Sequence, residues 1–321
     1  MPPPLVGTPS AGLVARPTRY PRRRGGLGAY LRGVAIGFLG GALVMSLLAA
    51  ALLVLFLAPN GRTNILLLGL DRRPDEQTTA VRSDTMILVT VNPKARYMGM
   101  LSIPRDLYVT QPDGSTDRIN TAYFFGELAA PGTGPAMAMQ VVRANFGVSV
   151  DRYVRVDLAG FVDVIDALGG IDLTVPDPLV DDEYPTYDYG TTTVSFDAGQ
   201  QHMDGERALA YARIRHGSSD LQRAERQQRV IVAALQKLLS PLTWPRLPLV
   251  AAAVSRSVQT NLSLLEIMRL APTLLWVGPG KIDSRVIEGD MVQPTITDGG
   301  ADVLLPVWDG INPVLLSMFG Q

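Results

Sequence analysis

TMILVTVNPKARYMGMLSIP, residues 85–104, contains two apolar runs around a turn signal. The runs at 85–92 and 97–104 have the length and composition of buried strands. Asn92-Pro93-Lys94-Ala95, which lies between them, is typical of a turn. Two strands joined by so short a link form an antiparallel hairpin, so the sequence predicts a hairpin here.

The hairpin register determines which polar residues meet at the sheet edge. With the turn centred in the link, Asp84 is expected to lie beside residues 103–105. The apolar run NILLLGL at 64–70 predicts another strand, and a polar loop returns the chain from it to Asp84. If these strands are antiparallel neighbours, Asp71, Asp84 and Arg105 meet at one edge of the sheet. Loops at strand ends are where α/β proteins place ligand sites.

The rest of the chain alternates between strand and helix patterns. Strands are predicted at 153–158, 171–176 and 282–288, and helices at 135–146, 160–168, 204–213, 221–239, 262–276 and 311–319. Residues 177–193 are acidic, rich in tyrosine and without an apolar period, which predicts a loop. No internal repeat or linker divides residues 60–321, so one α/β domain is expected there.

Residues 33–58 are uncharged and mostly apolar. As a helix this run is long enough to cross about 30 Å of hydrocarbon. A cleaved signal peptide has a shorter apolar region, so a transmembrane anchor is favoured. Six arginines precede the run: Arg16, Arg19, Arg22, Arg23, Arg24 and Arg32. The positive-inside rule then places residues 1–32 in the cytoplasm and makes residues 60–321 an extracytoplasmic domain of a single-pass membrane protein. The tail is rich in Pro, Gly and Arg, so it is predicted to be disordered.

Glycines recur every four residues in this run, at Gly33, Gly37 and Gly41. Such spacing allows two helices to approach closely and could support a dimer. Glycine is also common in membrane helices that do not associate, so both interpretations stay open.

The composition excludes several kinds of site. The chain has 321 residues and no cysteine, which excludes disulfides, thiolate metal sites and a cysteine nucleophile. It has two histidines, His202 and His216, too few for a zinc site of several imidazoles. The net charge of −1 gives no global field for a polyanion, and no nucleic-acid partner is expected. An anion site must therefore come from locally clustered arginines.

The predicted sheet edge brings carboxylates and arginine together. Two close carboxylates repel each other, and one tends to take up a proton unless a cation joins them. Mg²⁺ prefers a few carboxylates together with water and phosphate oxygens, so Asp71 and Asp84 are candidate ligands of Mg²⁺ or Mn²⁺. Arginine provides a planar fork of donors that suits the remaining phosphate oxygens.

A second basic cluster lies in YARIRHGSSDLQRAERQQR, residues 211–229. Its candidate phosphate ligands are Arg213, Arg215, Arg223, Arg226 and Gln227. The last three share one face of a helix, whereas the first two share a face only in an extended segment. The alternative is a solvated helix face whose ion pairs are worth about 0–1 kcal/mol. Spacing alone leaves both open.

At these residues the sequence resembles the LytR-CpsA-Psr family of cell-envelope proteins. The matching stretches are NILLLGLDRR (64–73), RSDTMILVTVNP (82–93), LSIPRDLYV (101–109), DRIN (117–120), VDRYVRVDLAGFVDVIDALGGIDLTVP (150–176) and MDGERALAYARIRHGSSDLQRAERQQ (203–228). They cover most of residues 64–235 in the expected order. One departure is Leu221-Gln222, where relatives often have an aromatic-glycine pair.

The resemblance implies a three-layer α/β/α domain with a central mixed sheet and an apolar pocket for a polyprenyl tail. It implies a phosphotransferase that moves a glycopolymer from a polyprenyl-diphosphate carrier to peptidoglycan and releases polyprenyl phosphate. The family's metal-site aspartates fall on Asp71 and Asp84, which with Arg105 form the expected catalytic group. The family's diphosphate-binding residues fall on Arg82, Arg105, Arg213, Arg215, Arg223 and Gln227, and Arg226 lies in the same motif. Either aspartate could be the base for the attacking hydroxyl.

Two other functions remain compatible with these residues. A diphosphatase would use the same groups and replace the sugar hydroxyl by water. A regulator of envelope assembly would bind a lipid diphosphate without turnover. Paired carboxylates beside the arginines favour chemistry, because binding a diphosphate needs only cations.

Overall fold

The computed structural model describes residues 27–57, 61–72, 78, 80–186, 190–214 and 220–320. The chain divides into two compact units, Met1–Leu55 and Phe56–Gln321. Of the predicted cytoplasmic tail, residues 1–26 lie outside the described residues.

The first unit contains α1, a 31-residue helix that spans Leu27–Leu57. Within it, Tyr30–Leu53 is long and apolar enough to cross a membrane, with a mean hydropathy of 2.3. The helix covers the predicted run at 33–58 except for Ala58, which lies outside the described residues. The glycines at 33, 37 and 41 all lie on α1, and a dimer through them stays a prediction.

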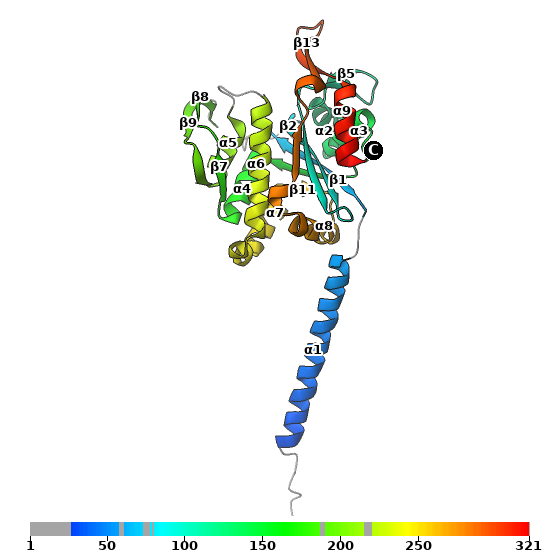
Figure 1. The fold of residues 1–321 in the computed structure, drawn as a ribbon, viewed down its shortest axis with the longest axis vertical. Helices are drawn as coiled ribbons and strands as arrows, with labels where there is room; N and C mark the ends of the chain where they lie inside the picture. Colours follow the sequence, from blue (N-terminus) through cyan, green and yellow to red (C-terminus); the bar gives the residue numbers. More distant parts are fainter. Residues whose placement is uncertain are drawn as a thin grey trace, which may run out of the picture. The chain divides into compact units, whose positions relative to one another are not determined.

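The second unit is built around a six-stranded mixed sheet (Figure 1). Its strand order is β11-β6-β1-β2-β3-β12. The strands span Val258–Thr260 (β11), Arg152–Asp157 (β6), Thr63–Leu70 (β1), Ser83–Asn92 (β2), Tyr97–Ile103 (β3) and Asp283–Val286 (β12). β2 is antiparallel to β1 and β3, whereas β6 is parallel to β1. In the hairpin Met86 faces Ile103, which confirms the predicted pairing and register.

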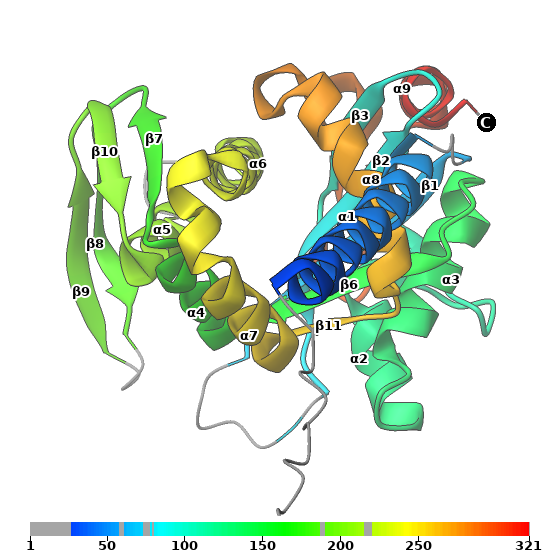
Figure 2. The same cartoon turned by 90° about the horizontal axis from the view of Figure 1, so that it is seen from below.

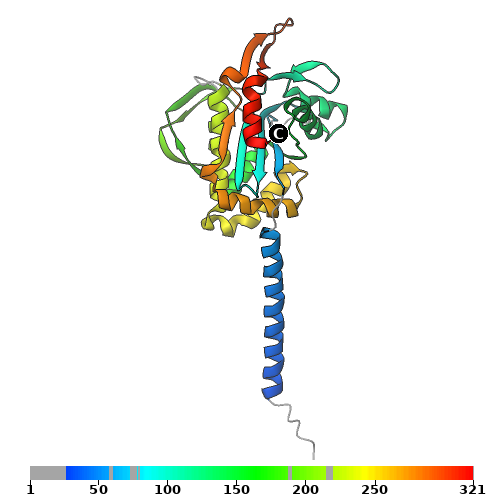
Figure 3. The same ribbon diagram turned by 45° about the vertical axis from the view of Figure 1, so that its right-hand side comes forward.

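Helices cover both faces of this sheet, and the three-layer prediction is therefore confirmed (Figures 1 and 3). One face carries α2 (Thr121–Ala129), α3 (Gly134–Phe146) and α9 (Trp308–Phe319). The other carries α4 (Leu158–Leu168), α5 (Gly205–Arg213), α6 (Asp220–Leu239) and α8 (Leu264–Val277). Alternation along β2 separates the two cores, because Leu88 packs against α2, α3 and α9, whereas Val91 packs against α8.

Residues 177–193 do not form the predicted loop. They contain β8 (Leu179–Pro185) and part of β9 (Thr191–Phe196), which pair antiparallel. The prediction was wrong because few side chains of this hairpin are buried, so the sequence shows no apolar alternation. Two further hairpins pair β4 (Tyr108–Thr110) with β5 (Thr116–Arg118) and β13 (Val292–Ile296) with β14 (Asp302–Pro306). β7 (Ile171–Val175) pairs antiparallel with β10 (Gly199–Met203), and the β8–β9 hairpin lies between them in the chain.

The sequence analysis also missed the segment after α6. It contains a 3₁₀ helix, η1 (Pro241–Arg246), and a helix, α7 (Leu247–Ser257), that packs against α4. Prolines at 241, 245 and 248 obscured this segment, although the first turn of a helix tolerates proline.

Replacing Leu101 on β3 by alanine should lower the free energy of unfolding by about 2–5 kcal/mol, because a fully buried side chain leaves a cavity. The matched control is Leu316→Ala on α9, whose side chain is 63% exposed and should change stability by only about 0.5 kcal/mol. Chemical unfolding of the detergent-solubilised chain checks this. Equal effects in both variants would contradict the assigned core.

Candidate active site

Three charged residues meet where β1, β2 and β3 end or begin at the same sheet edge. Asp71 follows β1, Asp84 lies at the start of β2 and Arg105 follows β3. The guanidinium Nη1 of Arg105 donates to Oδ2 of Asp84 at 3.1 Å. The predicted meeting of Asp84 and Arg105 is confirmed, and it follows from the antiparallel register of the hairpin.

The end of strand β1 requires a glycine, Gly69. A bulge shifts the β1–β2 register between Gly69 and Leu70. A Cβ atom on Gly69 would lie 2.9 Å from the Cβ atom of Thr85, closer than side chains tolerate. Because β1 can approach Thr85 this closely, the chain leaves the sheet with Asp71 next to the start of β2.

Helices α5 and α6 bring the second basic cluster over this edge. Arg213 is the last residue of α5, and its Nη2 donates to Oδ1 of Asp71 at 3.0 Å. Its guanidinium also lies 5.9 Å from the ring centre of Tyr184. Burial raises the pKa of the Tyr184 phenol, an effect that Arg213 partly opposes.

Arg223 lies in the first turn of α6 and is largely buried. Its Nη2 pairs with Oδ1 of Asp220 at 2.8 Å. Gln227 lies one turn further along the same helix. Arg213, Arg223 and Gln227 therefore come from two helices to one place above the sheet edge.

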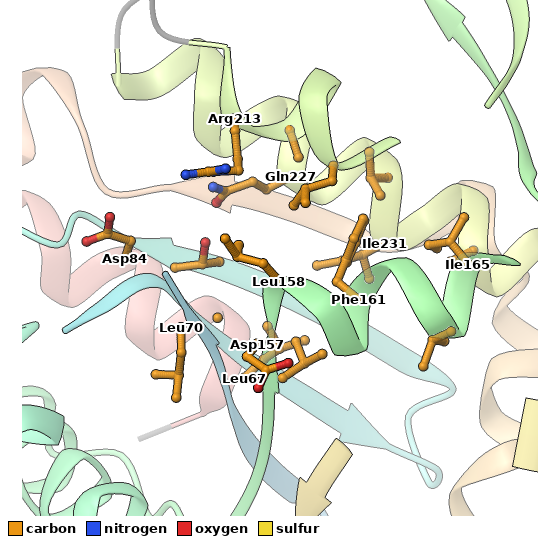
Figure 4. Close-up of a pocket in the computed structure, with 18 of the residues that line it drawn as sticks. Leu67, Leu70, Asp84, Asp157, Leu158, Phe161, Ile165, Arg213, Gln227 and Ile231 are labelled. Atoms are coloured by element: carbon orange, nitrogen blue, oxygen red, sulfur yellow. The ribbon is translucent and has the colours of Figure 1, made fainter. Parts of the chain in front are cut away.

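Below these residues lies an apolar cavity of about 280 Å³ (Figure 4). The sheet contributes Leu67 and Val156, α4 contributes Phe161, and α6 contributes Ile231 and Ala234. The polar residues at one end of the lining are Asp71, Asp84, Arg213, Arg223 and Gln227. The site therefore combines a charged mouth with an apolar interior.

A smaller hollow of about 120 Å³ adjoins the first. The two share Asp84, Arg223 and Gln227, and the smaller one adds Arg105 and Glu288. Burial raises the pKa of the Glu288 carboxyl, and the charge of Glu225 adds to this effect. The charged residues therefore form a partition between an apolar and a more polar space.

Arg105 is held from two sides. Its Nη1 bonds Asp84, and its Nε lies 3.3 Å from Oδ2 of Asp106. Burial lowers the pKa of the guanidinium, but the charges of Asp84 and Asp106 outweigh burial and leave the pKa raised. Asp106 also pairs with Arg118 at 3.2 Å, so it orients Arg105 within a larger ion network.

The side chain of Arg226 does not reach the mouth, unlike those of Arg223 and Gln227. It is 3% exposed and lines neither hollow. Its Nε donates to the carbonyl oxygen of Tyr211 at 3.1 Å, and its Nη2 donates to that of Ile214 at 2.6 Å. The prediction that Arg226 faces the diphosphate with Arg223 and Gln227 is corrected accordingly, because its side chain turns toward α5.

Of the other two predicted ligands, only Arg82 is described by the structure, and it does not lie at the mouth. Arg82 precedes β2, is exposed and lines neither hollow. Arg215 lies outside the described residues, as does His216.

The sequence analysis missed Asp157. This residue ends β6, pairs in register with Leu70 of the parallel strand β1, and lines the apolar cavity. Its Oδ1 accepts from the backbone N–H of Gly160 at 2.9 Å and caps α4, while Oδ2 pairs with Arg72. The parallel pairing of β1 and β6 was the missing signal, because it brings the ends of both strands to one edge.

The carboxylates can form only part of a metal site. Among the residues that the structure describes, no group of three or more acidic or histidine side chains could hold a metal ion. Asp71 and Asp84 line one cavity mouth and supply two carboxylates. This donor set fits Mg²⁺ or Mn²⁺ if water and phosphate oxygens complete the coordination.

Residues 50–304 match the sequence profile of the LytR_cpsA_psr family. The chain belongs to this family. The resemblance seen in the sequence motifs is thereby confirmed, and the LytR_cpsA_psr match includes all the residues of the mouth described above.

Several similar proteins are named as teichoic acid transferases. The polyisoprenyl-teichoic acid–peptidoglycan teichoic acid transferase TagU of Oceanobacillus iheyensis is 39% identical over 209 residues, which are 64% of this chain and 61% of that protein. The chain thus spans about three fifths of that relative's length.

Solved structures of the same group resemble the fold. Bacillus subtilis TagV matches with a TM-score of 0.63 at 29% identity, over 81% of this chain and 98% of that one. A structure of TagT bound to LI-WTA matches with a TM-score of 0.62 at 26% identity, over 82% of this chain and 92% of that one.

The different roles of two neighbouring arginines can be tested. Arg226→Met should lower the free energy of unfolding by about 1–3 kcal/mol, because it leaves two carbonyls without their donor. Arg223→Met at the mouth should destabilise less and mainly reduce binding of a prenyl diphosphate. Thermal unfolding and titration calorimetry with farnesyl diphosphate measure both. A normal melting temperature for Arg226→Met would show that the bonds of Arg226 to the two carbonyls do not stabilise the fold.

Proposed function

We propose that this chain is a membrane-anchored transferase that moves a glycopolymer from a polyprenyl-diphosphate carrier to peptidoglycan and releases polyprenyl phosphate. The observation that carries the proposal is the apolar cavity with arginines and carboxylates at its mouth. Such a site matches a ligand with a hydrocarbon tail and a charged head. The names of the TagU and TagV relatives support the same reaction class.

The cavity would hold the first isoprene units of the carrier. Phe161 of α4 and Ile231 of α6 line it close to one another (Figure 4). Removing hydrocarbon from water drives this binding without directional contacts, so the tail would provide affinity and the mouth would provide position.

Arginines of the mouth would bind the diphosphate. Arg105, Arg213 and Arg223 converge on it from three elements, and Gln227 adds an amide donor. Arg213 and Arg105 pair with Asp71 and Asp84 in this structure. A bound diphosphate would share these guanidinium groups, and a cation would then compensate the carboxylates. Arg82 and Arg215 remain further candidates from the family resemblance.

Asp71 and Asp84 would hold Mg²⁺ or Mn²⁺ together with phosphate oxygens. When bound, the ion would neutralise charge on the diphosphate, which is the main requirement of phosphoryl transfer. The acceptor hydroxyl oxygen would form a bond to the glycan-bearing phosphorus. The bond from that phosphorus to the bridging oxygen would break, and its electron pair would leave with polyprenyl phosphate. Asp71 or Asp84 would accept the hydroxyl proton.

The membrane arrangement is part of the proposal. α1 would span the bilayer, the arginine-rich end would lie in the cytoplasm, and the α/β unit would lie outside. This arrangement would put the site in the compartment that contains peptidoglycan.

Arg105→Ala should reduce glycan transfer on the order of 100-fold, because one preorganised donor to the developing charge is lost. The measurement is transfer in vitro from a short-chain prenyl-diphosphate glycan to peptidoglycan fragments. Release of prenyl phosphate without peptidoglycan would instead favour the diphosphatase, and tight binding without release would favour the regulator. Wild-type turnover in this variant would remove Arg105 from the site.

Asp84→Asn should abolish transfer that depends on added Mg²⁺ or Mn²⁺, because the amide supplies a poorer ligand and no negative charge. Asp290→Asn, an exposed carboxylate outside both hollows, is the matched control and should keep wild-type activity. Circular dichroism verifies folding. Unchanged metal dependence in Asp84→Asn would reject this assignment.

Ala234→Phe should narrow the cavity and raise KM for a long-chain donor more than for a short one. The exposed Ala136→Phe on α3 serves as control. The ratio of kcat/KM for donors of different chain length is the readout. An equal loss for all chain lengths would show that the tail lies elsewhere.

A further inference from the structure

The end of the sheet opposite the charged mouth has an unusual apolar surface. Its exposed fractions are 89% for Leu242, 61% for Trp244 and 62% for Leu249 on η1–α7, and 72% for Leu264, 52% for Leu275 and 44% for Trp276 on α8. We call these six residues the α7–α8 face. Large exposed apolar side chains gathered at one end of a folded unit mark an interaction surface.

The α7–α8 face lies at one end of the unit. Figures 1 and 2 show α7 and α8 together at the end where the β2–β3 hairpin turns. Leu274 of α8 packs in one cluster with Val91, and Val91 pairs with Thr63, the first residue of β1. Leu239, which ends α6 just before η1, packs against the same cluster. The face therefore adjoins the point where the chain enters the sheet.

The chain length ties this point to the proposed membrane span. Five residues, 58–62, separate the end of α1 at Leu57 from Thr63. A fully extended chain of this length reaches only about 20 Å. If α1 crosses the bilayer, the start of β1 cannot lie far from the membrane surface.

The charge of this segment suits anionic lipid. Residues 240–281 contain four basic residues, Arg246, Arg256, Arg269 and Lys281, against the single acid Glu266, although the whole chain has a net charge of −1. Glu266 is itself paired with Arg152 at 2.6 Å. A segment that combines an excess of basic residues with exposed tryptophan and leucine is typical of a surface that lies in the interface of a bilayer.

We propose that the α7–α8 face rests in the outer leaflet interface of the membrane and binds anionic phospholipid. This inference depends on the membrane span and lipid donor of the proposed function. It also bears on how the polyprenyl tail of the donor reaches the apolar cavity. Leu235 lines the apolar cavity and also packs with the cluster that supports α8. The cavity thus extends from the charged mouth toward the face, so the part of the tail beyond the cavity would continue toward the lipid.

Tryptophan quenching tests the contact directly. The chain has three tryptophans, Trp244, Trp276 and Trp308. Trp308 begins α9, packs 5.6 Å from the ring of Phe146, and is the internal control. Three full-length variants, each keeping one tryptophan and replacing the others by phenylalanine, are placed in nanodiscs of phosphatidylcholine and phosphatidylglycerol with brominated acyl chains. Trp244 and Trp276 should lose most of their fluorescence, and Trp308 should not.

Quenching of Trp244 no stronger than that of Trp308 would overturn the proposal. Acrylamide, a quencher dissolved in the water, then distinguishes a face exposed to water from a face covered by protein. Quenching of Trp244 by acrylamide alone means that the face is in water. Protection from both quenchers means that protein, such as a second copy, covers it. Either result rejects the lipid contact.

A functional arm separates this inference from the proposed function. Leu249→Glu with Leu264→Glu should lower transfer from a bilayer-resident donor several-fold while transfer from a water-soluble short-chain donor stays normal. Ile296→Glu on β13, equally exposed at 68% but at the opposite end, should change neither. Normal transfer from the bilayer donor in the double variant would contradict the membrane contact. Absence of transfer from both donors by the unaltered chain would instead reject the proposed function.

Discussion

The antiparallel pairing of β1 with β2 and of β2 with β3 is the constraint on which the site depends. It brings one end of each of three strands to a single edge, so Asp71, Asp84 and Arg105 become neighbours although 34 positions separate the first from the last. No side-chain attraction is needed to assemble them. The backbone ladder fixes their positions, and the ion pairs only select the rotamers.

The charges at this edge lie over an apolar cavity, and the two environments reinforce each other. Partial burial strengthens each Arg–Asp interaction compared with water, while the open side still lets a ligand reach the guanidinium groups. Asp106 and Arg118 extend the network behind Arg105. A site of this kind positions a charged head without large rearrangement of its walls, which suits a reaction that depends on alignment.

Much of this arrangement was predictable from local sequence. The hairpin register placed Asp84 beside Arg105, and helix periodicity placed Arg223 with Gln227. The same periodicity gave the wrong surroundings for Arg226, because a helical position does not reveal which neighbour its side chain meets. Asp157 was missed because the pairing of β6 with β1 is a long-range contact. The β8–β9 hairpin was missed because its strands bury too few side chains to leave a pattern.

The bonds of Arg226 have a consequence for the connection between α5 and α6. One guanidinium joins the carbonyls of Tyr211 and Ile214 to the second turn of α6. Arg213 and Arg223 are therefore held at a fixed spacing by this brace, independently of the chain that links the two helices. A change in chain length between Ile214 and Asp220 that kept these two bonds would therefore alter the distance between Arg213 and Arg223 less than their separation along the sequence suggests.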